Sequence, residues 1–285
     1  MSAADGRGEL FVREWGSSDA SPVVAIHGIT ASHLAWAHVA SAVPELRLIA
    51  PDLRGRGASA HLAGPFGMAR HAADIVRVLD AAGLDRVPLV GHSMGAFVAL
   101  VTAHRYPDRV SGLLLVDGGL PLRPPPGHTV ETVAQLLGPA AARLEMEFTD
   151  REAYRDFWRA HPAFNDPRDW SPELEEYLDY DLVGHEPRLH SRTSGEAMRA
   201  DQVELYGGDE VVASVTELRH PATLLTAPRG LQNETPGLYS PAEIDKWRAA
   251  LPSVVIEEVA DTNHYTIAMT ARGASVVGEK IRQLV

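Results

Sequence analysis

Short apolar runs alternate with helical segments along most of this chain, and this alternation constrains the fold more than any other feature. The runs lie at residues 23–26, 46–50, 87–90, 112–116, 222–226 and 254–259. Residues 69–83 show the clearest helical spacing of apolar side chains between two of these runs. Residues 9–15 alternate as expected for an edge strand. Strands that alternate with helices predict an α/β fold in which helices cover both faces of a parallel sheet.

The alternation stops between residue 121 and about residue 220. This interval opens with a proline-rich stretch at 121–127, which neither a helix nor a central strand tolerates. It continues with helical segments that are rich in aromatic side chains. We therefore predict a helical insertion at 121–219 in a core formed by 1–120 and 220–285. Most of its aromatic residues would hold the insertion together, and Trp158, Trp170 and Tyr180 are candidates to line a substrate pocket.

The charge and the composition exclude several classes of partner and chemistry. The formal net charge is −12, and no Lys/Arg cluster is present that could contact a phosphate backbone, so we expect no nucleic-acid partner. The absence of cysteine excludes disulfides, thiol nucleophiles and thiolate metal sites. No apolar leader is visible, and apolar runs such as 97–103 are shorter than the roughly 18 residues of a membrane span. These features predict a cytoplasmic protein without membrane contact.

A serine between two glycines follows one of the apolar runs. Residues 91–95 read Gly-His-Ser-Met-Gly, and an apolar helical segment follows them. Gly and Ser are common turn residues, so this could be an ordinary strand end. The pattern Gly-x-Ser-x-Gly between a strand and a helix is also typical of a nucleophile elbow, a sharp turn that exposes the serine hydroxyl. Both flanks fit the elbow, and we interpret Ser93 as a nucleophile.

A serine nucleophile needs a base within hydrogen-bond reach. His264 is our candidate because residues 261–265 lie between the last predicted strand and the last predicted helix. Loops at the carboxyl edge of a parallel sheet carry functional groups in such folds. His92 is interpreted as a packed neighbour of the serine.

Donors for an oxyanion are expected in the backbone. His27 and Gly28 follow the run at 23–26 directly, which makes the Ile29 N–H one candidate and the Met94 N–H the other. Gly28 would let the backbone approach the substrate closely, and His27 would organise this loop.

Four motifs together resemble the α/β-hydrolase superfamily. They are His27-Gly28 after a strand, residues 52–57 (Asp-Leu-Arg-Gly-Arg-Gly) after the next, the Gly-x-Ser-x-Gly at 91–95, and a late Asn263-His264. The resemblance covers about residues 9–120 and 220–285. It implies a mostly parallel central sheet flanked by helices, with the interval between at the usual position of a helical cap. It also implies a structural role for Asp52.

The acid that orients the histidine departs from the usual pattern of this superfamily. The resemblance places it after the strand that follows the cap, but residues 227–230 read Ala-Pro-Arg-Gly. Glu234 lies slightly farther along this loop. Asp117, after the run at 112–116, matches the position used by certain lipases, haloalkane dehalogenases and fungal-toxin lactonases. We favour Asp117, although an aspartate before two glycines is also an ordinary turn residue.

These residues predict acyl chemistry. No metal-ligand spacing and no nucleotide-binding glycine pattern is present, so we expect neither a metal nor a cofactor. Ser93 replaces the aspartate of the alkyl-enzyme members of the superfamily. We predict a hydrolase for a small-molecule carboxylic ester or lactone with an apolar or aromatic part. A thioesterase, a C–C bond hydrolase, a perhydrolase and a hydrolase-like ligand receptor stay as alternatives, and a homo-oligomer is compatible with the sequence.

Overall fold

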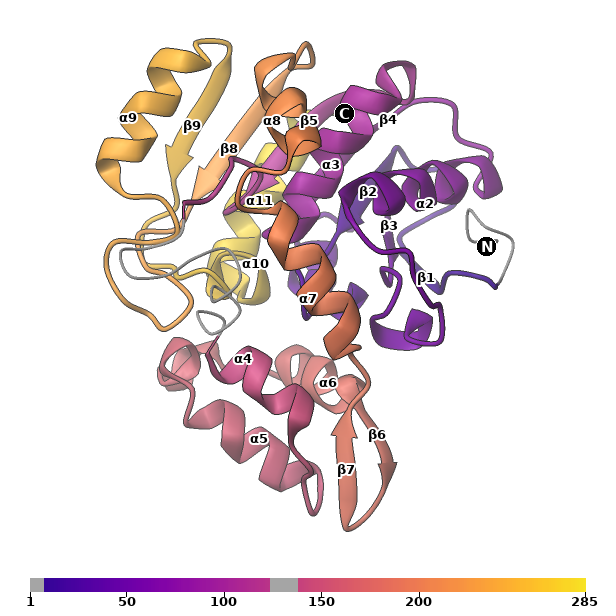
Figure 1. The fold of residues 1–285 in the computed structure, drawn as a ribbon, viewed down its shortest axis with the longest axis vertical. Coiled ribbons are helices and arrows are strands. Elements are labelled where there is room, and N and C mark those ends of the chain that lie inside the picture. Colours follow the sequence, from indigo (N-terminus) through magenta and orange to yellow (C-terminus); the bar gives the residue numbers. More distant parts are fainter. Residues whose placement is uncertain (1–7, 124–137) are drawn as a thin grey trace.

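A seven-stranded sheet forms the centre of the molecule (Figure 1). The computed structural model describes residues 8–123 and 138–285, so most of the proline-rich stretch lies outside the described residues. The strands, in order across the sheet, are β1 (Val12–Trp15), β3 (Arg47–Pro51), β2 (Pro22–Ile26), β4 (Val87–His92), β5 (Val110–Val116), β8 (Ala222–Thr226) and β9 (Val254–Glu258). Strand β1 is antiparallel to β3, and the other neighbours are parallel. The predicted fold class is confirmed.

Helices cover both faces of this sheet. Successive side chains of a strand point to opposite faces, so Val24 and Ile26 join one apolar core while Val23 and Ala25 join the other. The first face carries α2 (Met68–Ala81), α3 (Met94–Arg105), α8 (Asp209–Thr216) and α9 (Pro241–Ala250). The second face carries α1 (Ala37–Ala42), α10 (Thr266–Met269) and α11 (Ala271–Arg282).

Between β5 and β8 the chain forms a second group of elements. They are α4 (Pro139–Ala142), the short 3₁₀ helix η5 (Arg143–Glu145), α5 (Arg151–Arg159), α6 (Pro172–Asp181), β6 (Leu182–His185), β7 (Arg188–Ser191) and α7 (Gly195–Glu204). Figure 1 shows α4, α5, α6 and the two strands together at the lower end of the molecule, with α7 leading back to the sheet. We call the elements from α4 to α7 the insertion.

The insertion differs from the predicted helical segment in two ways. Strands β6 and β7 form an antiparallel hairpin. Gly184, with a φ of +102°, and Pro187 in the turn both oppose a helix there. Helix α8, although it lies before residue 219, packs on α3, and its Val211 and Val215 belong to the core of the sheet domain. The excursion from the sheet therefore ends before α8.

Within 8–123 and 138–285, no helix combines the length and the apolar character that a membrane crossing requires.

Candidate active site

Ser93 lies at the junction of β4 and α3, with a φ of 55° and a ψ of −124°. An ordinary side chain rarely adopts this conformation, so the surroundings must hold it. The neighbouring glycines leave the space that the turn needs. A Cβ atom on Gly91 would lie 2.2 Å from the Gly95 carbonyl oxygen, and one on Gly95 would lie 2.0 Å from that of Ile26. The predicted strand–turn–helix therefore forms because positions 91 and 95 have no room for a side chain.

Ser93, His264 and Asp117 form one chain of hydrogen bonds. The Ser93 hydroxyl lies 3.0 Å from Nε2 of His264, and Nδ1 of His264 lies 2.7 Å from Oδ2 of Asp117. Because a carboxylate only accepts hydrogen bonds, Nδ1 carries the proton and Nε2 is free to accept from the serine. The second oxygen of buried Asp117 accepts the Ala227 N–H at 3.0 Å. The arrangement joins a hydroxyl, a base and an orienting carboxylate.

Glu234, the alternative acid, lies in a different environment. Its Oε2 accepts the N–H of Gln232 at 2.6 Å, so the carboxylate turns back onto its own loop. No hydrogen bond joins it to His264 in the described part of the chain.

The loop after β2 approaches the serine closely. A Cβ atom on Gly28 would lie 3.2 Å from Cβ and 3.6 Å from Oγ of Ser93. The N–H of Ile29 donates no hydrogen bond within the described residues. Met94 is the first residue of α3, so its N–H has no partner within the helix. Both predicted oxyanion donors are therefore available beside Ser93.

His27 orients the peptide that carries the Ile29 N–H. Leu53 donates its N–H to Nε2 of His27 at 2.9 Å, and Nδ1 of His27 therefore donates to the Gly28 carbonyl at 2.8 Å. Burial lowers the pKa of His27 to about 4, which keeps the ring neutral and this tautomer intact. The C=O and N–H of a trans peptide point in opposite directions, so the Ile29 N–H points away from His27.

His92 has a role that the sequence did not reveal. Its Nε2 donates to the backbone carbonyl of His264 at 2.7 Å, and its buried Nδ1 has no hydrogen-bond partner among the described residues. Burial lowers the pKa of His92 to about 3, so the ring stays neutral. His92 thus anchors the backbone of the base. The position of His92 beside Ser93 was the sole sequence signal, and it did not indicate a partner so distant in the chain.

A small cavity of about 30 Å³ opens onto Ser93 and His264. The insertion contributes Ala140 and Tyr177 to its wall. The remaining lining residues are Gly28, Ile29, Thr30, Ala31, His92, Leu231, Tyr265 and Met269.

The three aromatic residues predicted to line the pocket lie elsewhere. Trp158 is buried in an aromatic cluster of the insertion with Tyr154, Phe157 and Phe164. Trp170 donates its indole N–H to the Phe164 carbonyl at 3.0 Å. Tyr180 donates to Oδ2 of Asp52 at 2.6 Å. The structure thus brings Gly28 to Ser93 but none of these three side chains, which hold the insertion together and onto the core.

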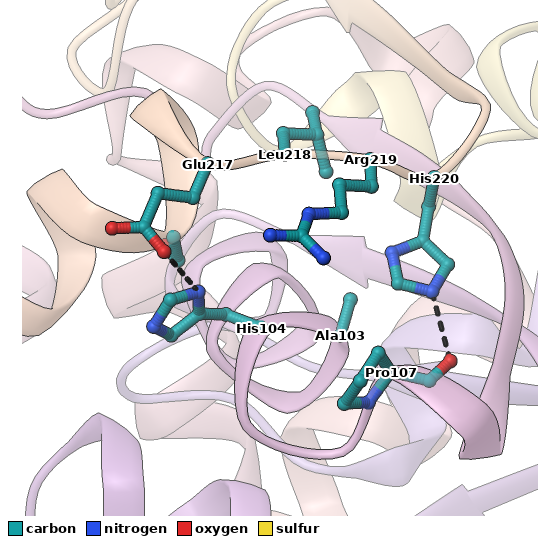
Figure 2. A pocket seen from close by; sticks show the side chains of 8 residues that line it. Ala103, His104, Pro107, Glu217, Leu218, Arg219 and His220 are labelled. Carbon is teal, nitrogen blue, oxygen red and sulfur yellow. Dashed lines mark hydrogen bonds and ion pairs between the residues drawn. The ribbon is translucent and has the colours of Figure 1, made fainter.

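A second cavity, of about 120 Å³, lies at the amino ends of β5 and β8, away from Ser93. Figure 2 shows His104, Arg219 and His220 converging on it. His220 donates to the Pro107 carbonyl at 2.9 Å, and His104 lies 3.8 Å from Glu217. Basic groups are favoured here because α3 and α8 both end nearby, and helix carboxyl ends attract cations. The described ranges contain no group of three or more His, Asp or Glu side chains suited to hold a metal ion.

Comparisons with known proteins agree with the fold. A family model described as the alpha/beta hydrolase fold matches residues 21–144. The lipase LipV of Mycobacterium tuberculosis is 32% identical over 170 residues, which cover 60% of this chain and 62% of LipV. The 2-hydroxy-6-oxo-2,4-heptadienoate hydrolase of Pseudomonas putida is 41% identical over 101 residues, covering 34% of this chain and 37% of that enzyme. The match thus spans less than two thirds of each of these relatives.

Solved structures match over nearly the whole chain. The thioesterase domain from the curacin biosynthetic pathway has a TM-score of 0.74 and 22% identity, and the match covers 96% of this chain and 95% of that domain. The E-2-(acetamidomethylene)succinate hydrolase has a TM-score of 0.78 and 20% identity, with 99% and 97% covered. At these identities the likeness shows the fold.

Proposed function

We infer that the chain belongs to the α/β-hydrolase superfamily, and from this premise we propose that it is a serine hydrolase that cleaves a carboxylic ester or lactone. The observation that carries the proposal is the hydrogen-bond chain from Ser93 through His264 to Asp117. It lies beside the Ile29 N–H, which has no partner in the part of the chain that the structure describes. A nucleophile, an oriented base and an oxyanion donor are the three requirements of acyl transfer.

Each group has a defined task in the proposed reaction. Ser93 Oγ attacks the substrate carbonyl while Nε2 of His264 accepts the serine proton. The N–H groups of Ile29 and Met94 hold the negative charge that develops on the carbonyl oxygen. His264 then protonates the leaving alcohol, which departs and leaves an acyl group on Ser93. A water molecule, deprotonated by His264, attacks this acyl-enzyme, and the returning proton restores the serine. Asp117 holds the imidazole tautomer and stabilises the imidazolium.

The cavity beside Ser93 supports a small substrate. Its volume of about 30 Å³ is far smaller than the roughly 300–1,000 Å³ of a pocket that encloses a drug-sized ligand. Apolar side chains of Ala31, Ala140, Leu231 and Met269 line it. We propose that the substrate has a short, apolar acyl part.

A second candidate function is hydrolysis of a C–C bond next to a ketone. Tyr177 and Tyr265 are buried and line the cavity, and their hydroxyls have no hydrogen-bond partner in the described residues. Burial raises the pKa of both phenols, which therefore stay protonated as donors. Donors without a protein partner that line a cavity can bind an acceptor of a ligand, such as a second carbonyl or a carboxylate of the substrate.

A substrate panel with matched variants tests the proposal. The panel contains p-nitrophenyl acetate, butyrate and octanoate, an aromatic lactone, an acetyl thioester and a β-diketone. We expect the acetate to be the best p-nitrophenyl ester, and Ser93→Ala to lower kcat by more than about 10⁴-fold. A folded wild type that turns over none of these compounds would contradict the proposal and favour a ligand receptor. Ligand binding that Ser93→Ala leaves unchanged would identify such a receptor.

Two tyrosine variants separate the candidate functions. If the second candidate holds, Tyr177→Phe and Tyr265→Phe each lower kcat/KM for the β-diketone by about tenfold, the effect of one lost hydrogen bond. Turnover of p-nitrophenyl acetate, which offers no second carbonyl, serves as the control and stays unchanged. Equal effects on both substrates would contradict this candidate.

A further inference from the structure

Three successive carbonyl groups of the loop at residues 28–31, the oxyanion loop, accept hydrogen bonds from buried side chains. The Gly28 carbonyl accepts from Nδ1 of His27 at 2.8 Å. The Ile29 carbonyl accepts from Nε of Arg56 at 2.9 Å. The Thr30 carbonyl accepts from Nη2 of Arg143 at 2.7 Å. The first two donors belong to the sheet domain, whereas Arg143 belongs to the insertion.

Arg143 is held in place by the insertion itself. Its Nε donates to the Tyr154 hydroxyl at 2.9 Å and lies 3.2 Å from Oδ2 of Asp181, and its Nη1 donates to the Ala140 carbonyl. Its guanidinium also lies over the ring of Trp158, 5.4 Å from the centroid. Arg143 is 1% exposed. With this many fixed partners, the guanidinium has little freedom to move away from Thr30.

The second arginine that contacts the oxyanion loop, Arg56, is also held by the insertion. Arg56 lies 2.6 Å from Oδ2 of Asp201 on α7, and both side chains are fully buried. Asp201 in turn accepts the Gly67 N–H at 2.6 Å and contacts His71 at 2.9 Å. Carboxylates of the insertion, Asp181 and Asp201, therefore hold both arginines that contact the loop.

Two peptide groups connect the Arg143 contact at Thr30 to the Ile29 N–H. The Thr30 carbonyl and the Ala31 N–H belong to one peptide, and this N–H donates back to the Gly28 carbonyl at 3.2 Å. The Gly28 carbonyl and the Ile29 N–H belong to a second peptide, which this hydrogen bond links to the first. Because each peptide is planar, fixing the Thr30 carbonyl limits rotation of both groups.

We propose that Arg143 is a positioning residue through which the insertion holds the oxyanion loop in its reactive arrangement. The proposal rests on the serine-hydrolase function proposed above. Arg143 touches no reacting atom, and its effect is on the direction of the Ile29 N–H. A displaced insertion would release the Thr30 carbonyl and weaken the stabilisation of the oxyanion.

The test compares Arg143→Met, Arg143→Lys and Arg155→Met. Arg155 also belongs to the insertion and pairs with Asp179 at 2.8 Å, but it does not contact the oxyanion loop, so it is the matched control. Two readouts are used: kcat and KM for p-nitrophenyl acetate, and the rate at which a fluorophosphonate labels Ser93. A fluorophosphonate places its P–O oxygen in the oxyanion site, so labelling reports on that site without knowledge of the natural substrate.

Arg143→Met is expected to lower kcat and the labelling rate by about 10- to 100-fold, somewhat less than the 10²–10³ for complete loss of an oxyanion donor. KM is expected to change little, and Arg143→Lys, which keeps one donor, should restore part of the rate. Arg155→Met removes a partly exposed ion pair and should stay within about twofold of wild type. Tyr154→Phe, a milder change that loosens Arg143, should lower the rate by about threefold, near the lower end of the range for one hydrogen bond because its effect is indirect.

The outcomes separate the two proposals. A folded Arg143→Met variant that is labelled at the wild-type rate, or that changes KM alone, overturns the positioning role and leaves the serine hydrolase intact. If Arg143→Met does not fold, unchanged labelling of Tyr154→Phe overturns it. A wild type that is not labelled at all contradicts the serine-hydrolase proposal, and the positioning role falls with it.

Discussion

Asp117 shows how one residue can satisfy two conditions at once. Its backbone has a φ of +44°, in the left-handed region that Asp and Asn tolerate better than most residues. Its side chain is fully buried, and both oxygens accept hydrogen bonds, from His264 and from the Ala227 N–H. The turn and the orientation of the base therefore depend on the same residue.

The two candidate acids are separated by a pair of variants. Asp117→Asn presents an amide in place of one carboxylate oxygen, which disturbs the His264 tautomer, and should lower kcat by roughly 10³–10⁴-fold. Glu234→Gln should leave kcat within about twofold, since a surface substitution away from such a network has little effect. Initial rates with p-nitrophenyl acetate and the melting temperature of each variant test this. The reverse order of effects would assign the acid to Glu234.

At the scale of an element, the turn from β4 into α3 is defined by close backbone contacts. A Cβ atom on Gly118 would lie 2.3 Å from the Ser93 carbonyl oxygen, so the end of β5 also presses on the turn. Backbone atoms, unlike the ends of flexible side chains, cannot move aside. The spacing of glycines in the sequence therefore reflects backbone packing as well as conformational freedom.

Gly95→Ala measures this packing. Its Cβ would lie 2.0 Å from the Ile26 carbonyl oxygen, and we expect the free energy of unfolding to fall by about 3 kcal/mol or more, the upper range for overpacking. Gly83→Ala is the control, because that position has a φ of +68° but no atom within 4 Å of the new Cβ. The left-handed backbone alone should cost it about 1–2 kcal/mol. Urea unfolding that gives equal losses would contradict the steric explanation.

At the scale of the whole molecule, buried ionic groups join elements that are distant in the chain. Arg54 pairs with Asp74, Arg56 with Asp201, and Arg143 with Asp181. Contacts with His71 and Arg56 outweigh burial and hold the pKa of Asp201 well below its usual range. Removing one partner of such a pair leaves a buried charge, which is strongly destabilising. The insertion and the sheet domain are therefore expected to unfold together.

The buried histidines predict the pH dependence of stability. Burial lowers the pKa of His27 to about 4 and that of His92 to about 3, from 6.5 in the unfolded chain. Burial also lowers the pKa of His161 to about 4, which adds to the same trend. Between pH 6.5 and 4 the unfolded state therefore binds protons that the folded state does not. The free energy of unfolding should fall with the pH in this window, by up to about 1.4 kcal/mol per pH unit for each histidine.

Urea unfolding at pH 7, 6 and 5 tests this expectation, with His92→Gln as the variant that lacks one of these histidines. The variant should show a smaller decrease than wild type. The lowered pKa of Asp201 acts in the same direction but below its unfolded value of 3.8, so it does not obscure this window. Stability that is constant from pH 7 to 5 would contradict the neutral, buried state of His27 and His92.

The strands and helices of the sheet domain could be predicted from the sequence because the apolar patterns that indicate them are local. Residues 69–83 were predicted as a helix and α2 spans Met68–Ala81, since apolar spacing depends on near neighbours. The β6–β7 hairpin was not predicted, because its strands have only four residues each and are too short for a clear alternating pattern. The placement of Trp158 and Tyr180 was also beyond the sequence, since several faces of the insertion are aromatic.

The sequence by itself determined which segments form the strands of the central sheet and that Ser93 lies at a sharp turn, because apolar period and glycine spacing act over a few residues. Tertiary structure alone brought Asp117 rather than Glu234 to His264, and Arg143 to Thr30. These contacts join residues 147 and 113 positions apart. Such distant partners meet only through the packing of the whole chain, which no local pattern encodes.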